Sequence, residues 1–214
     1  MARAESTVAI TISPPKFVTI PIQIVGTAPY CQARFSAKAQ QAMKSKMEAG
    51  STAKKGKARE ARDFDADFEG AKHISTDGWV GIPAAAFRKA MIDVCRAVNF
   101  KMTHAKMSVF VEADGFDNVD GVPLVKLIAG QPEKLEMAVR NATGVADIRV
   151  RPMWRKWGAN VRVKFDSDQF TASDVVNLMS RAGQQIGVGE GRAFSRDSAG
   201  IGYGGFAVQE TKAK

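Results

Sequence analysis

The chain has 214 residues, which suits one domain with room for an insertion, and 45% of them are hydrophobic, which excludes global disorder. Its formal net charge of +9 favours a polyanionic partner, above all nucleic acid, with a merely soluble basic protein as the alternative. The two cysteines, Cys31 and Cys95, form no CxxC pair, which argues against a zinc site and against a disulfide-built secreted domain.

No membrane segment is expected, because no apolar run reaches about 18 residues. The first residues also lack the apolar stretch of a signal peptide. We therefore expect a soluble protein of the cytoplasm.

Two strands are predicted near the start of the chain, at 7–12 and 17–25, because both segments are rich in β-branched residues. Pro21 lies inside the second segment, where it removes a ladder hydrogen bond. It therefore predicts an edge position or a bulge.

A basic segment follows, at about 34–65, and is interpreted as an insertion into a single domain that spans 1–214. Residues 37–50 are compatible with a helix, whereas 51–60 have the composition of a loop. The segment is either a solvated loop or a basic arm that becomes ordered on a nucleic-acid backbone. The second alternative assigns backbone contacts to Lys44, Lys46, Lys54, Lys55, Lys57 and Arg59.

The middle of the chain predicts a short strand at 79–82 that leads into a helix opened by Pro83. A second helix is expected from Thr171, which stands three residues before Asp174 as in a capping box. Further strands are expected at 105–113, 122–129, 147–153, 160–165 and 206–210. This order predicts an α+β, ferredoxin-like fold with two helices on one face of an antiparallel sheet.

Residues 147–153 and 160–165 are predicted to pair as a hairpin. Alternation within a strand then gathers four cations on one exposed face, and no Asp or Glu lies between residues 149 and 164 to balance them. The face is either plainly solvated or follows a phosphate backbone. Its members are Arg149, Arg151, Arg162 and Lys164, extended by Arg155 and Lys156 at the tip.

The same tip carries Trp154 and Trp157. Three roles are open for them: stacking on splayed bases, packing on a neighbouring subunit, or covering the core.

Seven glycines crowd the segment 184–206. It contains no GxxxxGK[ST] motif, and its GxGxG follows a helix instead of opening one, so both nucleotide-cofactor interpretations fail and no cofactor is expected. Interleaved apolar residues argue against a linker. We predict a tightly turned loop whose backbone passes close to a bulky neighbour, with amides free to meet an anion. Its backbone positions are Gly187, Gly189, Gly191 and Gly202, with charge from Arg192 and Arg196.

Two segments carry a resemblance to a known family. "GWVGIPAAAFRKAMIDVCR", at 78–96, resembles the IPGSSLRGALR-like motif of the RAMP superfamily, the ferredoxin-fold RNA-binding subunits of CRISPR effector complexes. "GVGEGRAFSRDSAGIGYGGF", at 187–206, resembles that superfamily's glycine-rich loop. One departure is that Ala84-Ala85-Ala86 stand where the family usually has Gly-Ser-Ser. The compact length and the overall texture resemble bacteriophage proteins, which implies a stand-alone relative in a bacterial host cell.

The resemblance implies non-catalytic binding of single-stranded RNA or DNA, with copies assembling side by side along the strand. It adds Arg88, in the matching motif, to the expected contacts. A RAMP-type endoribonuclease is the first alternative, and a phage structural or regulatory protein acting on a CRISPR complex is the second.

No catalytic residue is assigned. His104 is interpreted as structural, and His73 follows an acidic run that is either solvated or a site for a divalent ion. That run contains Asp63, Asp65 and Asp67.

Overall fold

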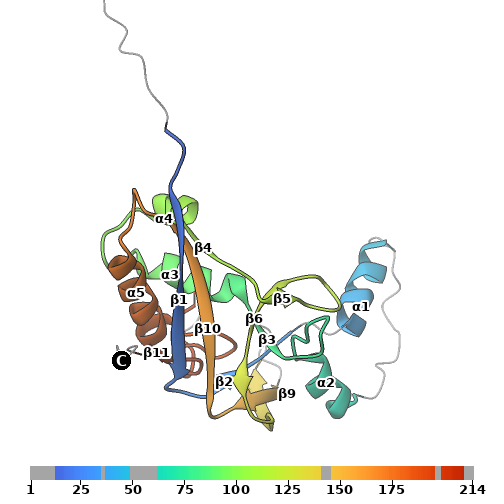
Figure 1. Cartoon of the computed structure of the whole chain (residues 1–214). Helices are drawn as coiled ribbons and strands as arrows, with labels where there is room; N and C mark the ends of the chain where they lie inside the picture. The colour runs from blue at the N-terminus through green and yellow to red at the C-terminus, as the bar shows by residue number, and fades with distance from the viewer. Residues whose placement is uncertain (1–12, 35–36, 49–61, 141–145, 196–198, 210–214) are drawn as a thin grey trace, which may run out of the picture.

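The computed structural model describes residues 13–34, 37–48, 62–140, 146–195 and 199–209 (Figure 1). Its largest sheet has the strand order β11-β1-β10-β4 with all neighbours antiparallel, and the short β7 also pairs with β10. The bounds are β1 Phe17–Gly26, β4 Val109–Val111, β7 Ile128–Ala129, β10 Trp157–Asp166 and β11 Phe206–Val208. The protein is therefore a mixed α+β protein with antiparallel sheets, as predicted.

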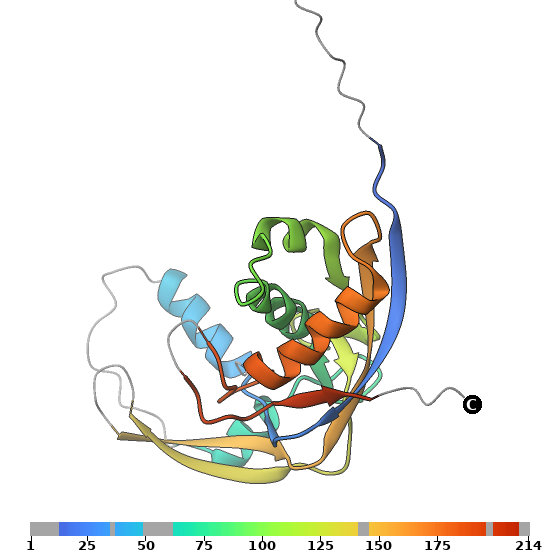
Figure 2. The same ribbon diagram turned by 90° about the vertical axis from the view of Figure 1, so that its left-hand side faces the viewer.

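Helices cover one face of this sheet, in the concave space seen in Figure 2. They are α3 (Ala84–Val94) and α5 (Ala172–Arg181), the latter continuing into a π-helical turn, η2 (Ala182–Ile186). The predicted helix starts are confirmed: α3 begins directly after Pro83, and Thr171 forms a capping box with Asp174. A third helix, α4 (Met102–Ser108), occupies the first half of the strand predicted at 105–113, which begins only at Val109.

The position of Pro21 agrees with an edge. β10 lies along the whole of β1, whereas β11 pairs only with Ile24–Gly26, so β1 has a single partner at Pro21. The missing N–H therefore costs no ladder hydrogen bond on the open side.

Two smaller sheets extend the domain. One has the order β2-β9-β8, from β2 (Tyr30–Cys31), β8 (Glu133–Arg140) and β9 (Ala146–Trp154). The other has the order β3-β6-β5, from β3 (Gly81–Pro83), β5 (Gly115–Phe116) and β6 (Pro123–Lys126). Helix α2 (Phe64–Gly70) packs against β9, and α1 (Ala37–Glu48) begins the basic segment. The strand predicted at 7–12 lies outside the described residues.

The predicted hairpin of 147–153 with 160–165 is wrong. β9 pairs with β8 and β2, whereas β10 pairs with β1, β4 and β7, so the two strands are consecutive in the chain but belong to different sheets. The chain crosses between the sheets at a buried aromatic corner. There the Tyr30 ring centroid lies 5.7 Å from that of Trp154 and 5.2 Å from that of Trp157. Burial of these aromatic rings favours the passage of the chain from one sheet to the other. The alternation of apolar and charged residues within each strand did not reveal it.

Among the described residues, no helix is both long and apolar enough to cross a membrane.

Candidate functional site

The predicted cation face does not form, because its members lie on two sheets and each arginine has a carboxylate partner. Glu190 accepts an ion pair from Arg151 at 2.7 Å and from Arg149 at 3.5 Å. Arg162 is 3.3 Å from Asp114 and 3.9 Å from Glu112. The expectation of an unbalanced face is therefore wrong, since every one of these acids comes from a segment outside 149–164.

Three cations of that prediction remain. Arg155 pairs with Glu133 at 2.9 Å on the surface, and the Lys164 ammonium lies 5.0 Å from the centroid of the Phe17 ring, in a cation–π contact. Lys156 is exposed at the tip. Lys156 and Lys164 are thus the two members of the set that have no carboxylate partner among the described residues.

Trp154 and Trp157 belong to the core. Their exposed fractions are 3% and 4%, and their indole N–H groups donate to the carbonyl oxygens of Gly130 and Ala28. Of the three roles left open by the sequence, covering the core is the one that fits. Neither ring is available for stacking on a base.

The other predicted contacts divide into engaged residues and residues outside the described ranges. The Arg88 guanidinium donates to the carbonyl oxygens of Val109 and Lys106 and lies 4.7 Å from the Phe110 ring centroid, so it fastens α3 to β4. Lys44 in α1 is exposed and 4.0 Å from Glu48. The side chain of Lys46 is not described, and Lys54, Lys55, Lys57, Arg59 and Arg196 lie outside the described residues.

The glycine-rich loop is tightly turned and closely packed, as predicted. Gly187, Gly189, Gly191 and Gly202 all have positive φ. At Gly189, with φ +85°, a Cβ atom would lie 2.6 Å from the Tyr30 ring. At Gly204, with φ +67°, it would collide with the carbonyl oxygen of Val188. Only glycine fits these two positions, because an L side chain is strained there and has no space.

Most of the loop amides are not free to meet an anion, contrary to the sequence-based expectation. The N–H of Val188 donates to Gly204 O, that of Glu190 to Cys31 O, and that of Gly204 to Pro29 O, at 2.7–3.0 Å. These bonds fix the loop against the segment that leads into β2. The loop backbone is thus held in place by these bonds, and the positive charge of the loop comes from a side chain.

That side chain is Arg192, which lies between two adjoining hollows that we call the loop groove. One, of about 340 Å³, is lined by Tyr30, Gln32, Ala33, His73, Pro83, Ala86, Gly189, Glu190 and Arg192. The other, of about 270 Å³, is lined by Ala85, Ala86, Lys89, Ala90, Asp93, Ile186, Gly187, Val188, Gly189 and Arg192. Ala86, Gly189 and Arg192 belong to both, so the two hollows adjoin at the start of α3.

The electrostatics of the loop groove favour an anion at its centre. Arg192 donates to Gly189 O at 3.3 Å and forms no ion pair within the described part of the chain. The first turn of α3, at Ala84-Ala85-Ala86, has no side-chain cap, so no capping side chain competes with an anion for its amides. The positive end of the helix dipole lies at the same turn. Because these three residues carry only methyl side chains, a ligand could approach their backbone closely. Against this stand Glu190, shared with two arginines, and the Lys89–Asp93 pair.

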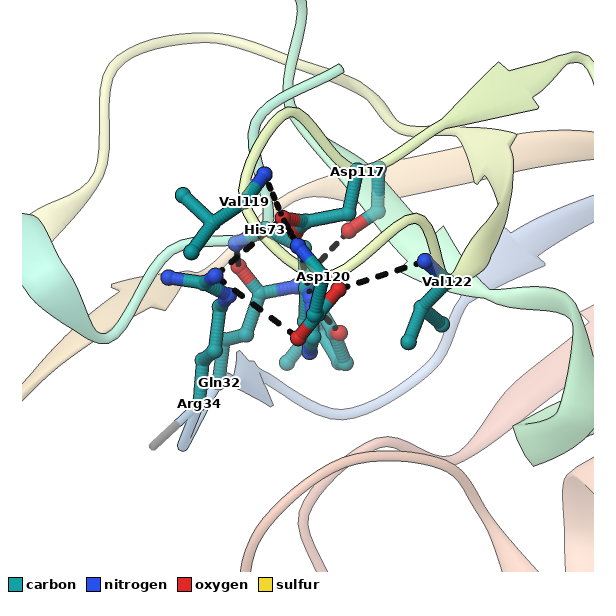
Figure 3. A network of polar contacts seen from close by, with 9 residues as sticks. Gln32, Arg34, His73, Asp117, Val119, Asp120 and Val122 are labelled. Carbon is teal, nitrogen blue, oxygen red and sulfur yellow. Dashed lines mark hydrogen bonds and ion pairs between the residues drawn. The ribbon is translucent and has the colours of Figure 1, made fainter. Parts of the chain in front are cut away.

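Next to the groove lies a buried polar network that the sequence did not reveal (Figure 3). The Nδ1 atom of His73 is 2.9 Å from Oδ2 of Asp117, whose other oxygen accepts from Arg34 Nη2 at 3.2 Å and from the Val119 amide at 2.9 Å. Asp117 comes from a turn some forty residues beyond His73 in the sequence, so spacing gave no signal. No partner of His73 Nε2 occurs among the described residues, and His73 lines the loop groove.

The carboxyl group of Asp117 stays ionised to a lower pH than an ordinary aspartate. Burial alone would raise the pKa of this carboxyl, but hydrogen bonds from the Val119 amide and His73 and the charge of Arg34 outweigh it, so its pKa lies below the usual range. His73, Asp117 and Asp120 could present ligand atoms within 4.8 Å of one another. The Arg34 guanidinium already contacts both aspartates, at 3.2 and 3.6 Å. The two carboxylates of the cluster therefore already share one cationic partner, the Arg34 guanidinium.

The other acidic and histidine candidates are peripheral. Asp63 caps α2 by accepting from the amides of Asp65 and Ala66, Asp67 pairs with Arg62, and Asp65 pairs with Lys134. Asp63, Asp65 and Asp67 thus have structural partners and do not converge on one point. His104 is exposed on α4, with its ring against Phe100.

No protein-family model matches this chain, and a search of curated proteins finds no match either.

Proposed function

We propose that the protein binds single-stranded nucleic acid, RNA or DNA, in the loop groove. The observation that carries the proposal is the meeting of two segments about a hundred residues apart. The start of α3 and the glycine-rich loop line two adjoining hollows, and Arg192 lines both of them. Arg192 and the uncapped amides of α3 would contact the sugar-phosphate backbone, which every sequence presents in the same way.

The arrangement of the main sheet supports the finer assignment to a ferredoxin-like, RAMP-type fold. The chain order β1-α3-β4-β10-α5-β11 is a β-α-β-β-α-β unit, and the spatial order β11-β1-β10-β4 puts its fourth strand beside its first. The two segments that resemble the RAMP motifs both line the loop groove, together with residues of the β2 segment and His73. Side-by-side assembly of copies along a strand remains part of this proposal.

The test is a fluorescence-anisotropy titration of a labelled single-stranded oligonucleotide, as RNA and as DNA, at two salt concentrations. We expect Arg192→Gln to weaken binding by about tenfold and to reduce the salt dependence by about one phosphate contact, because a lost charged hydrogen bond is worth about 1.5 kcal/mol. Arg181→Gln is the matched control, since Arg181 is exposed at the end of α5 and lies outside the groove.

Three results would end the proposal. They are no binding at low salt, equal binding by Arg192→Gln and the original protein, and equal losses in the Arg192 and Arg181 variants. The oligomer is read separately by sedimentation velocity with and without the oligonucleotide, where assembly without nucleic acid favours a structural role.

A second candidate function, an endoribonuclease, is favoured by the Asp117–His73 pair. A carboxylate on Nδ1 holds the imidazole and leaves Nε2 to accept a proton, the arrangement of a general base. Nε2 would take the proton of a ribose 2′-hydroxyl, whose oxygen attacks the adjacent phosphorus. The bond from phosphorus to the 5′-oxygen breaks, and that oxygen leaves with a proton from the imidazolium, which gives a 2′,3′-cyclic phosphate and a 5′-hydroxyl.

This candidate is tested by incubating the protein with labelled RNA and with a copy that carries one 2′-deoxy nucleotide. Cleavage that disappears in His73→Gln and at the 2′-deoxy position supports it. RNA that stays intact over a long incubation excludes it and leaves the binding function untouched.

A further inference from the structure

We propose that a second hollow, around Trp79, binds a nucleobase. The hollow measures about 410 Å³ and is lined by Trp79, Asp114, Lys126, Ile128 and Asn160. None of these residues lines the loop groove. The inference rests on the proposed function for the source of the base, a nucleic-acid strand, but the hollow itself is argued from its own contacts.

Trp79 differs from the other two tryptophans of the chain. Trp154 and Trp157 are buried and their indole N–H groups donate to backbone carbonyls. Trp79 is half-buried, and its indole N–H has no hydrogen-bond partner among the described residues. A large aromatic ring with one side in the protein and a free donor at its edge is typical of a binding surface.

Two glycines hold the Trp79 ring against the sheet β3-β6-β5. A Cβ atom at Gly115 would lie 2.7 Å from Cζ2 of the indole, and one at Gly81 would lie 2.9 Å from Cζ3. Gly81 and Gly115 stand on the strands that flank β6, and a larger side chain at either position would collide with the ring. A ring fixed in this way loses little conformational entropy when a base stacks on it.

The polar groups around the ring suit a base and its phosphate. The side-chain amide of Asn160, which offers both a donor and an acceptor, is exposed and has no hydrogen-bond partner in the described chain. The Lys126 ammonium lies over the Trp79 ring, 6.0 Å from its centroid, so a stacking base would displace it, and it could then contact the phosphate attached to that base. Asp114 is occupied by Arg162 and by the Lys126 amide, so it adds no free negative charge.

One short hairpin joins this hollow to the loop groove. The Gly81 amide donates to His73 O at 2.9 Å, and Ile74 pairs with Val80, so residues 73–81 fold back on themselves. His73 at one end of the hairpin lines the loop groove, and Trp79 lines the second hollow. A strand held in the loop groove therefore has a stacking surface near it, on the other side of the same hairpin.

The experiment follows tryptophan fluorescence and anisotropy together in the full chain. The probes are a labelled oligoadenylate and, in a separate titration, adenosine monophosphate. We expect oligoadenylate to quench fluorescence in the original protein and not in Trp79→Phe, since the two buried tryptophans are shielded. Trp79→Ala is expected to weaken oligonucleotide binding at least about fivefold, the smallest effect of one lost base stack.

Asn160→Ala provides a variant whose folding is not in question, because the side chain is exposed. We expect it to weaken binding about threefold, the order of one hydrogen bond. Gln23→Ala is its matched control: Gln23 pairs with Asn160 across β1 and β10, is equally exposed, and lies outside the hollow.

The outcomes separate the two proposals. Unchanged binding and quenching in the Trp79 and Asn160 variants, with a loss in Arg192→Gln, overturns the base site and keeps the proposed function. Quenching by adenosine monophosphate that depends on Trp79, without any oligonucleotide binding, overturns the proposed function and supports a site for a free nucleotide. No effect of either probe overturns both.

Discussion

Two arginine-bearing regions of the molecule differ in one respect that decides what they can bind. Along β9 and β10 each of Arg149, Arg151, Arg155 and Arg162 has a carboxylate within 4.0 Å. In the loop groove Arg192 has none among the described residues. The difference shows that the number of cations in a segment says little about which ligands the segment binds. An arginine that is already paired with a carboxylate must lose that ion pair before it can bind a phosphate.

The largest effect is expected at the most buried matched pair, Arg34 with Asp117, whose side chains are 6% and 0% exposed. Asp117→Ala removes the nearer carboxylate from the buried Arg34 guanidinium and leaves only Asp120, at 3.6 Å, and we expect it to lower the free energy of unfolding by about 3 kcal/mol. Urea unfolding measures the change. Asp77→Ala, at an exposed aspartate on the 73–81 hairpin, is the control, and equal losses in both variants would contradict the prediction.

The lowered pKa of Asp117 leads us to predict that the stability of the protein depends on pH. The pKa of this carboxyl in the folded protein lies below the ordinary value of about 3.9 that it has in the unfolded chain. The stabilisation is therefore fully present above about pH 4 and is lost as the pH falls through the lower, folded-state pKa. Thermal melts between pH 6 and pH 2 measure it, and the acid loss should be smaller in Asp117→Asn. A melting curve that falls equally in both proteins would place the acid-sensitive group elsewhere.

Glu190 lies where the two regions meet, because it lines the loop groove and neutralises Arg149 and Arg151. We expect Glu190→Gln to strengthen oligonucleotide binding about threefold and to steepen its salt dependence, since a charge at a partly solvated site contributes on the order of 0.5–1 kcal/mol. Anisotropy at two salt concentrations measures both. The control is Glu133→Gln, which frees Arg155 away from the groove, and a gain there of the same size would mean that location does not matter.

The smallest effect is expected for the exposed pair of Arg155 with Glu133, whose side chains are 64% and 52% exposed. Arg155→Gln should change the free energy of unfolding by less than about 0.5 kcal/mol. It should also leave oligonucleotide binding unchanged. A clear loss of binding in an anisotropy titration would restore the sheet face as a nucleic-acid surface and would contradict the comparison.

The parts of the fold that depend on local chemistry were readable from the sequence. Pro83 marked the start of α3, Thr171 with Asp174 marked that of α5, and the glycines of the loop predicted a turned backbone. Each depends on hydrogen bonds or sterics within a few residues. The pairing of β9 with β8 depended on burial, and so did the choice among the three roles left open for Trp154 and Trp157, of which stacking is excluded. Trp79, which we propose as a stacking residue, was not singled out from the sequence.

The α+β composition, the helix starts and the turned loop that carries Arg192 follow from spacing, capping and backbone freedom, which can be read along the chain. Which charges are free depends instead on how the folded chain brings distant residues together. Glu190, Glu133 and Asp114 neutralise arginines that lie 22 to 48 positions away in the chain, and Asp117 meets His73 across 44. Charge compensation depends on distance in space, which the order of residues does not contain.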